Sequence, residues 1–298
     1  CQAFSLAGLG IKNNHDLHNG FDDDRQGTLF FEIVRVLKHH RPKVFVLENV
    51  KNLLHHDGGR SFDQILHILE KELGYNVQYK VINALGLVPQ HRERVFIVGF
   101  RKETPFRLDG FTLTYPDQSP TLSDVLEASP PTSHTISHRR WEWAKRHAIK
   151  TGGRFTHRVF KPTDTAPTLI ASYHKDARSC LISQGRGRRP RRLTPREAAR
   201  LMGFPDDFAI PVSTSQAYRQ FGNTVVVPLV KQLAGALQPY LAKGTKGGYT
   251  VRGEGLERFA TKYDLGSAES ALSNKHSQRN RVSEGTRNAV ETKSYDPP

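Results

Sequence analysis

The sequence predicts an α/β fold built on an open sheet, and three observations lead to this fold class. Two helical segments and three strand segments alternate along the first hundred residues. The predicted strands are short and rich in apolar residues, as in buried strands of α/β sheets. The chain has 298 residues, 37% of them hydrophobic, which is enough for a substantial core. Such an alternation of helices and strands is typical of an open α/β sheet.

The first predicted helix covers Thr28–His40, where apolar residues recur at helical spacing. It ends before Pro42, because the residue that precedes a proline disfavours the helical region. The second covers Arg60–Gly74, and Gly74 is a suitable C-cap.

Three apolar segments are predicted as strands. Lys43–Leu47 is a continuous apolar run, and we interpret it as a buried parallel strand. Asn76–Ile82 alternates apolar and polar residues, and Val95–Phe100 is again continuous and apolar. These strands would form the sheet of the fold.

The pattern changes after residue 102. From there to Pro190 the periodicity is lost among Pro, Thr, Ser and basic residues, which indicates a separate loop-rich module. Helices are predicted again at Thr194–Leu201, with a capping box, and at Val225–Leu241. Residues 242–298 are polar without an apolar stripe, so we expect a weakly ordered tail.

The positive charge is concentrated in one region. Seventeen Lys or Arg and four acidic residues lie between His134 and Arg200, so this region carries +13 of the formal charge of +15. A concentrated positive field suits a polyanion, and nucleic acid is the commonest such partner. A solvated basic face or an acidic protein partner is the alternative.

Several classes of protein and site are excluded. No apolar run approaches the ~18 residues of a membrane span, and two cysteines cannot form a disulfide framework. The histidines and cysteines lack the spacing of metal ligands, so we expect no metal site. There is neither a Walker loop nor a complete Gly-x-Gly-x-x-Gly motif.

Polar residues stand beside two of the predicted strands, where open α/β sheets bind their ligands. Glu48 and Asn49 follow the run that ends at Leu47, and Arg92 and Arg94 precede Val95–Phe100. Taken alone, Glu48 could be a capping carboxylate, and the arginines could form a surface salt bridge.

Five motifs in order resemble those of the bacterial DNA (cytosine-5) methyltransferases, in particular the Dcm/EcoRII-like type. They are Cys-Gln-x-Phe-Ser at Cys1–Ser5, Glu-Asn-Val at Glu48–Val50, Gln-x-Arg-x-Arg at Gln90–Arg94, the block at Arg191–Pro205 and the block at Gln220–Pro228.

The resemblance implies a fold and a division into domains. Residues 1–102 would form part of the S-adenosylmethionine-dependent methyltransferase (Rossmann-like) sheet, as a catalytic domain that lacks the first motifs. Residues 103–190 would form a smaller loop-rich target-recognition domain, residues 191–241 the hinge and return to the catalytic domain, and residues 242–298 the tail.

The resemblance also assigns catalytic roles. Carbon 5 of cytosine is a poor nucleophile, so a thiolate, assigned to Cys1, must first add to carbon 6. Glu48 would protonate ring nitrogen 3, which requires a protonated or proton-sharing carboxyl group. Arg94 would hold the ring carbonyl oxygen, and Arg92 would brace the Cys1 loop. The target base must be flipped out of the duplex.

Further residues are assigned to S-adenosyl-L-methionine and to DNA. Leu29, Asn223, Thr224 and Val225 match cofactor-contacting positions of the family. The DNA-binding set is Gln2, Ser5, the Thr168-Leu169 pair and the arginines Arg186, Arg188 and Arg189, which with Arg191 and Arg192 resemble phosphate contacts more than base contacts.

The family's Phe-x-Gly-x-Gly loop, its acidic ribose ligand and the Pro before the nucleophile would all precede Cys1, and the sequence does not contain them. We therefore predict that this chain alone binds S-adenosylmethionine poorly and is almost inactive. Three explanations are ranked in this order: a fragment of an ordinary gene, one half of a split enzyme complemented by an N-terminal half on another chain, and a segment that follows an intein.

The predicted function is that of a DNA (cytosine-5-)-methyltransferase, from a restriction-modification system or acting as an orphan methylase. We expect a monomer in the bacterial cytoplasm, bound to double-stranded DNA and not to membranes. The alternative is a non-catalytic DNA-binding subunit. An amidohydrolase with an N-terminal Cys nucleophile ranks lower, because that fold starts with antiparallel strands.

Overall fold

The computed structural model describes residues 29–150, 158–176 and 180–241, which all belong to one compact unit, residues 1–243. The side chains of residues 147–150 and 176 are not part of this description. The predictions on Cys1, Gln2, Ser5 and the tail 242–298 lie outside the described residues.

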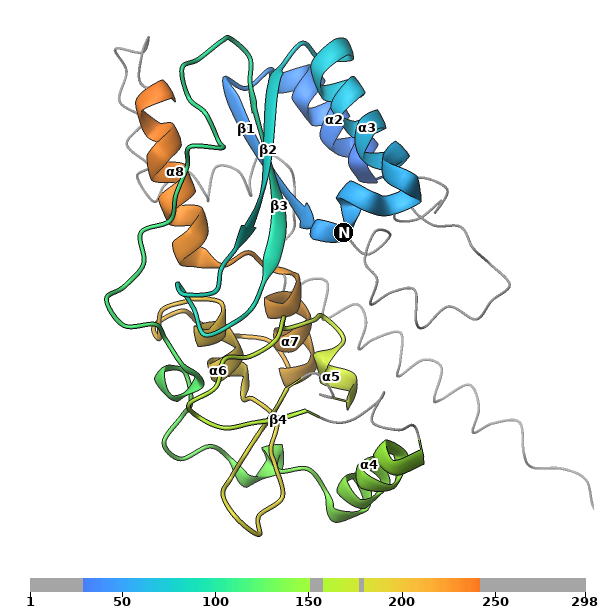
Figure 1. Ribbon diagram of the computed structural model, residues 1–298, viewed down its shortest axis with the longest axis vertical. Helices are drawn as coiled ribbons and strands as arrows, with labels where there is room; N and C mark the ends of the chain where they lie inside the picture. Colours follow the sequence, from blue (N-terminus) through green and yellow to red (C-terminus); the bar gives the residue numbers. More distant parts are fainter. Residues whose placement is uncertain (1–28, 151–157, 177–179, 242–298) are drawn as a thin grey trace, which may run out of the picture. The chain divides into compact units, whose positions relative to one another are not determined.

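Three strands form the main sheet: β1 (Val44–Val50), β2 (Asn76–Asn83) and β3 (Glu93–Phe100). Their order is β1-β3-β2, and both outer strands pair antiparallel with β3 (Figure 1). All three predicted strands are therefore present, each one or two residues longer than predicted.

The prediction that Lys43–Leu47 is a parallel strand is wrong, because β1 pairs antiparallel with β3. The connections along the chain give the reason. A helical segment carries the chain from β1 to β2, and these two strands run in the same direction on either side of β3. The nine residues between β2 and β3 contain no helix, and a short connection of this kind makes consecutive neighbours antiparallel.

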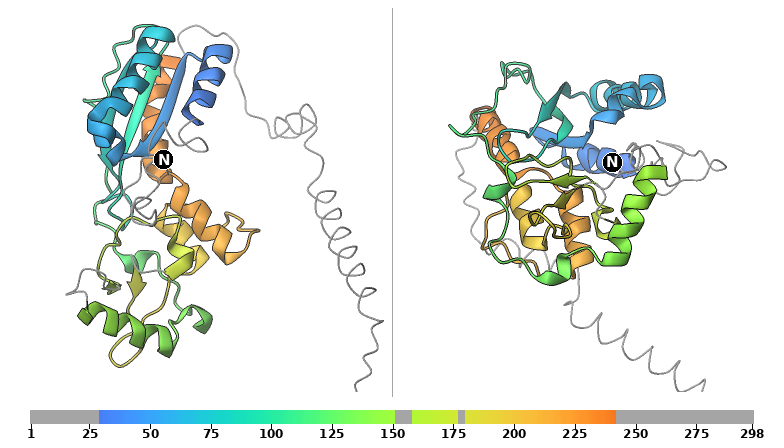
Figure 2. Two further views of the ribbon diagram at one scale, coloured as in Figure 1. Left: turned by 90° about the vertical axis from the view of Figure 1, so that its right-hand side faces the viewer. Right: turned by 60° about the horizontal axis from the view of Figure 1, so that its bottom comes forward.

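The two faces of the sheet are covered by different parts of the chain. Val95 and Ile97 of β3 pack in a cluster with residues of α2 (Leu29–His40) and α3 (Arg60–His67). The alternate residues Phe96, Val98 and Phe100 pack in a second cluster with α8 (Val227–Leu241). Figures 1 and 2 show α2 and α3 on one side of the sheet and α8 on the other. Side chains two residues apart on β3 therefore face the same layer.

The predicted helices are confirmed with small shifts at their ends. The helix predicted at Arg60–Gly74 is α3 followed by a π-helical turn at Ile68–Glu72, and Gly74 has the positive φ of 68° that suits a C-cap. In α6 (Pro195–Leu201), Thr194 and Glu197 form the predicted capping box. A 3₁₀ segment, Lys51–Gly59, joins β1 to α3.

The region from 103 to 190 is rich in loops, as predicted, but it contains a helix that the periodicity did not indicate, α4 (His138–Lys150). The helix α7 (Thr214–Asn223) was also not predicted. The remaining elements are short: η4 (Leu122–Asp124), η5 (Thr132–His134), β4 (Val159–Phe160), α5 (Tyr173–Asp176) and β5 (Leu181–Ile182), with β4 and β5 parallel.

One hydrophobic cluster extends across the boundary that we predicted at residue 190. It contains Val98 and Phe100 of β3, Leu169 and Leu181 of the loop-rich region, and Leu233 of α8. The described part of the loop-rich region thus shares its core with the sheet, which fixes it against the strand that carries Arg94.

Candidate active site at the end of the sheet

Glu48 and Arg94 form an ion pair on neighbouring strands. Glu48 lies opposite Phe96 and Arg94 opposite Val50, so the two charged residues are diagonal neighbours on one face of the sheet. Arg94 Nε lies 3.0 Å from Glu48 Oε1, and the two side chains are only 15% and 17% exposed. The structure therefore brings together two of the residues that we predicted to act on the cytosine ring.

Burial dominates the electrostatics of this pair. It raises the pKa of Glu48 above its ordinary value, although the positive charges of Arg94 and Arg92 act in the opposite direction. Burial also lowers the pKa of Arg94, against the effect of Glu48. A carboxyl group with a raised pKa is better suited to donate a proton than a fully exposed one.

Arg92 is 2% exposed, and its guanidinium joins three segments of the chain. Nη1 donates to the carbonyl oxygen of Leu169 at 3.0 Å, and Nη2 donates to those of Gly222 and Thr224 at 3.1 and 2.8 Å. Burial, together with the charge of Arg94, lowers the pKa of Arg92 to about 10. Nε has no hydrogen-bond partner within the described residues. Arg92 thus braces Leu169 and residues 222–224 against the start of β3. That it also braces the Cys1 loop stays a prediction, because Cys1 lies outside the described residues.

The predicted cofactor residues 223–225 begin at the last residue of α7, and Arg92 holds the carbonyl oxygen of Thr224. Gly222 permits this arrangement, because a Cβ at this position would lie 2.4 Å from the backbone nitrogen of Ala171. Asn223 is exposed, while Thr224 and Val225 are half-buried. Leu29, the first residue of α2, is 60% exposed, and the hydrogen bonds that join the other residues do not include it.

The sequence analysis did not assign a role to Gln90, which is completely buried. Its Nε2 donates to the carbonyl oxygen of Leu201 at 3.1 Å, and its Oε1 accepts from the backbone N–H of Leu169 at 2.8 Å. One signal could have indicated this role: Gln90 has the same spacing from Arg92 as Arg92 has from Arg94, so the three side chains follow one face of an extended segment.

The predicted DNA-binding residues have different environments. The side chain of Leu169 is 1% exposed in the core, so in this structure it packs rather than faces a ligand. Thr168 is half-buried, and its Oγ1 donates to the carbonyl oxygen of His91 at 2.7 Å. Arg186 and Arg188 are exposed in a loop, where each follows a glycine of positive φ, Gly185 and Gly187.

Two of the predicted phosphate-contacting arginines have protein partners. Arg189 Nη1 donates to the carbonyl oxygen of Ile136 at 3.0 Å. Arg191 forms a buried ion pair with Glu197 at 2.7 Å, with side chains only 5% and 0% exposed. The suggestion that Arg191 contacts phosphate is therefore wrong, because its charge is already paired inside the core.

The two cysteines of the chain are not equivalent candidates for a nucleophile. Cys180 is 2% exposed, and burial raises its pKa to about 12. Such a thiol is almost never ionised at neutral pH, and only the thiolate is a good nucleophile. Cys180 is therefore a structural residue.

The motifs extend over most of the chain, and so does the similarity to known proteins. The model of the family described as C-5 cytosine-specific DNA methylase matches residues 1–239. The chain belongs to this family.

Two bacterial proteins illustrate the similarity of this chain to curated relatives. It is 44% identical to the type II methyltransferase M1.ScrFI of Lactococcus lactis subsp. cremoris, over 83% of this chain and 62% of that protein. It is 41% identical to the DNA-cytosine methyltransferase of Escherichia coli strain K12, over 80% of this chain and 58% of that protein. The methylase chain thus spans about three-fifths of the length of these relatives.

Solved structures share the fold of this methylase. The methyltransferase EhMeth of Entamoeba histolytica matches 81% of this chain and 75% of its own, with a TM-score of 0.59 and 18% identity. The Dnmt2 methyltransferase of S. pombe matches 71% of this chain and 73% of its own, with a TM-score of 0.54 and 20% identity. The predicted α/β class and the methyltransferase fold are therefore confirmed.

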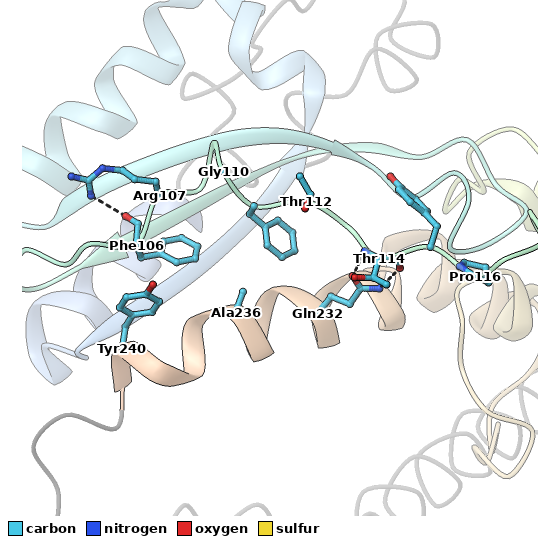
Figure 3. Close-up of a pocket in the computed structure, with 11 residues that line it drawn as sticks. Phe106, Arg107, Gly110, Thr112, Thr114, Pro116, Gln232, Ala236 and Tyr240 are labelled. Carbon is cyan, nitrogen blue, oxygen red and sulfur yellow. Dashed lines mark hydrogen bonds between the residues drawn. The ribbon is translucent and has the colours of Figure 1, made fainter.

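The methylase chain also has a groove of about 720 Å³ between the segment that follows β3 and α8 (Figure 3). Gln232 of α8 holds both the N–H and the carbonyl oxygen of Thr114 there. The groove contains none of the predicted site residues. In the part of the chain that the structure describes, there is no cluster of potential metal ligands, and no helix is long and apolar enough to cross a membrane.

Proposed function

We propose that this chain acts in the methylation of cytosine at carbon 5 in double-stranded DNA, with S-adenosyl-L-methionine as methyl donor. Membership of the family and the buried pair Glu48–Arg94 support this proposal. The observation that carries it is the shielded ion pair of Glu48 and Arg94 on neighbouring strands, with Arg94 Nε 3.0 Å from Glu48 Oε1.

The proposed nucleophile is Cys1, which lies outside the described residues. Two observations support this choice. Cys180, the other cysteine, is buried with a pKa of about 12. In addition, Arg92 Nε has no partner within the described residues, and we propose that a carbonyl group of the Cys1 segment accepts this hydrogen bond.

Each residue would have a defined task. The Cys1 thiolate adds to carbon 6 of the flipped cytosine, and Glu48 donates a proton to ring nitrogen 3 as the electron pair moves toward carbon 5. Arg94 holds both Glu48 and the ring carbonyl oxygen. Once carbon 5 carries the methyl group, loss of the carbon 5 proton, departure of the Cys1 sulfur as a thiolate and return of the proton from ring nitrogen 3 to Glu48 restore the neutral aromatic ring.

For the cofactor, we propose that Asn223, Thr224, Val225 and Leu29 form one wall of its site. The fit rests on the exposed amide of Asn223 and the exposed apolar side chain of Leu29. S-adenosyl-L-methionine supplies an electrophilic methyl group when it is bound. Arg92 would keep this wall in place through the carbonyl oxygen of Thr224.

For DNA binding, we propose that residues 103–190 form the target-recognition domain and that the exposed Arg186 and Arg188 contact phosphate groups. We propose that Thr168, whose Oγ1 donates to the carbonyl oxygen of His91 near the start of β3, contacts the backbone of the flipped nucleotide. We propose that Gln2 and Ser5 contact the DNA from the segment of Cys1.

A partial reaction tests the chemistry without a methyl donor. Addition of a thiolate to carbon 6 makes carbon 5 basic, so a proton from water enters there, and reversal releases the original hydrogen. The assay uses duplex DNA tritiated at carbon 5 of cytosine and measures release of tritium into water.

We expect the chain and its Cys180→Ala variant to release tritium, and we expect Cys1→Ala and Glu48→Gln to release it at least about 100-fold more slowly. Release that does not depend on Cys1 contradicts the mechanism. DNA binding without any release of tritium favours the alternative, a non-catalytic DNA-binding subunit.

A further inference from the structure

The segment Ala166–Leu169 is bound tightly to the residues that lead into β3. The backbone N–H of Ala166 donates to Pro89 O at 2.7 Å, and its carbonyl oxygen accepts from the N–H of His91 at 2.8 Å. Thr168 Oγ1 donates to the carbonyl oxygen of His91 at 2.7 Å. These bonds join residues more than 70 positions apart, so they determine how the loop-rich region sits against the sheet.

The side chains of Gln90 and Arg92 complete this junction at a single residue. Gln90 Oε1 accepts from the N–H of Leu169, and Arg92 Nη1 donates to its carbonyl oxygen. Both backbone polar groups of Leu169 are thus held by buried side chains. A buried hydrogen bond of this kind is costly to leave unmade, so the position of Leu169 is strongly specified.

The same row of side chains leads to the candidate active site. Residues 90, 92 and 94 are separated by two positions each, and an extended segment directs such side chains to the same face. Gln90 and Arg92 hold the segment that contains Thr168, and Arg94 holds Glu48. One short stretch therefore fixes both the proposed recognition segment and the proposed acid.

We propose that Gln90 is a positioning residue, which sets the backbone of the recognition segment Ala166–Leu169 against the strand that carries Arg94. Gln90 does not contact DNA in this proposal, because it is completely buried. It acts through the N–H of Leu169, and without it the segment is no longer aligned with the flipped base. This proposal rests on the proposed function, since it assumes that the segment faces DNA.

The test replaces Gln90 by methionine, which has a similar length but no amide group. Gln90→Asn is a second variant, which keeps the amide group on a side chain that is one methylene group shorter. Gln78→Met is a matched control, because Gln78 also holds backbone groups with both ends of its amide. It donates to Phe106 O at 3.0 Å and accepts from Leu108 N at 2.7 Å.

Two measurements are made on the full chain. Hydrogen exchange, followed by mass spectrometry, reports how firmly the Leu169 amide is held. Selection from a pool of random-sequence duplexes identifies the preferred DNA, and fluorescence anisotropy compares affinity for that duplex and for a mixed-sequence duplex.

We expect about tenfold faster exchange at Leu169 in Gln90→Met and a smaller increase in Gln90→Asn. We expect the preference for the selected duplex to fall about tenfold, with unchanged affinity for the mixed duplex, because phosphate contacts remain. Gln78→Met should change neither quantity.

Unchanged exchange or unchanged preference in both Gln90 variants overturns the proposal, and so does an equal loss in Gln78→Met. A wild-type chain that selects no sequence contradicts the proposed function itself. Exchange at Leu169 then still shows whether Gln90 holds the segment.

Discussion

Removal of one partner of the Arg191–Glu197 ion pair should destabilise the protein strongly. The Glu197 carboxylate accepts four hydrogen bonds of 2.7–2.8 Å, two from Arg191 and one each from the backbone N–H groups of Glu127 and Thr194. Because the pair is buried, Glu197→Gln leaves the guanidinium charge without a counterion. Loss of one partner of such a pair costs about 3–5 kcal/mol.

This cost is a large share of the about 5–15 kcal/mol by which proteins are stable. At about 2–4 °C for each kcal/mol, the melting temperature of Glu197→Gln should fall by about 6–20 °C. Urea denaturation followed by circular dichroism measures the free energy of unfolding directly.

The double variant Arg191→Met/Glu197→Leu should be less destabilised than either single variant, because it leaves no unpaired charge in the core. Asp206→Asn is the control, since Asp206 pairs with Arg200 at the surface and is 66% exposed. We expect no measurable change for it. A loss of less than about 1 kcal/mol in Glu197→Gln, or a double variant that loses the sum of the two single losses, would contradict this prediction.

Four further outcomes follow from the structure. Because burial raises the folded-state pKa of Glu48, its ionisation weakens the fold as the pH rises through that pKa; the free energy of unfolding of the wild type, relative to that of Glu48→Gln, should therefore fall as the pH rises from about 4 to 7, as urea denaturation at both pH values would show. Native Cys180 should remain unmodified by a soluble thiol reagent at about pH 8, as mass spectrometry would show, because its pKa is about 12. Gly222→Ala should lower the denaturation midpoint, because its Cβ would lie within 2.7 Å of neighbouring backbone atoms. Replacement of both Arg186 and Arg188 by alanine should reduce the dependence of log affinity for DNA on log salt by about 2, and an unchanged slope in a salt titration would contradict their role.

Features of the fold that depend on residues close together in the sequence could be predicted. The helix at Leu29–His40 follows its apolar periodicity, and the capping box at Thr194 follows from residues three positions apart. The direction of β1 could not be predicted, because an apolar run indicates burial but not the neighbouring strand. The helix α4 has too few apolar residues in its pattern to show the period.

The sequence likewise predicted only some of the residues and contacts of the candidate site. Glu48 and Arg94 could be predicted as site residues from their place in the sequence, because both lie next to apolar segments that form buried strands. The hydrogen-bond partners of Arg92 and Gln90 could not be predicted from the sequence. Their bonds join residues 77 to 132 positions apart and end on backbone atoms. A backbone acceptor has no sequence signature. The pairing of Arg191 was hidden for a different reason: in a basic run, the sequence does not show which arginine turns inward.

The way in which Ala166–Leu169 is attached affects how the proposed DNA-sequence specificity can change between related proteins. Of the five hydrogen bonds that hold this segment to residues 89–92, four use its main-chain atoms, and Thr168 supplies the single side-chain bond. Main-chain atoms are the same for every residue except proline. The exposed loops that flank the segment can therefore exchange side chains, or be replaced by loops of a related protein, while the attachment persists. A chimaera built with junctions outside Ala166–Leu169 should therefore keep the four main-chain hydrogen bonds that hold the segment to residues 89–92.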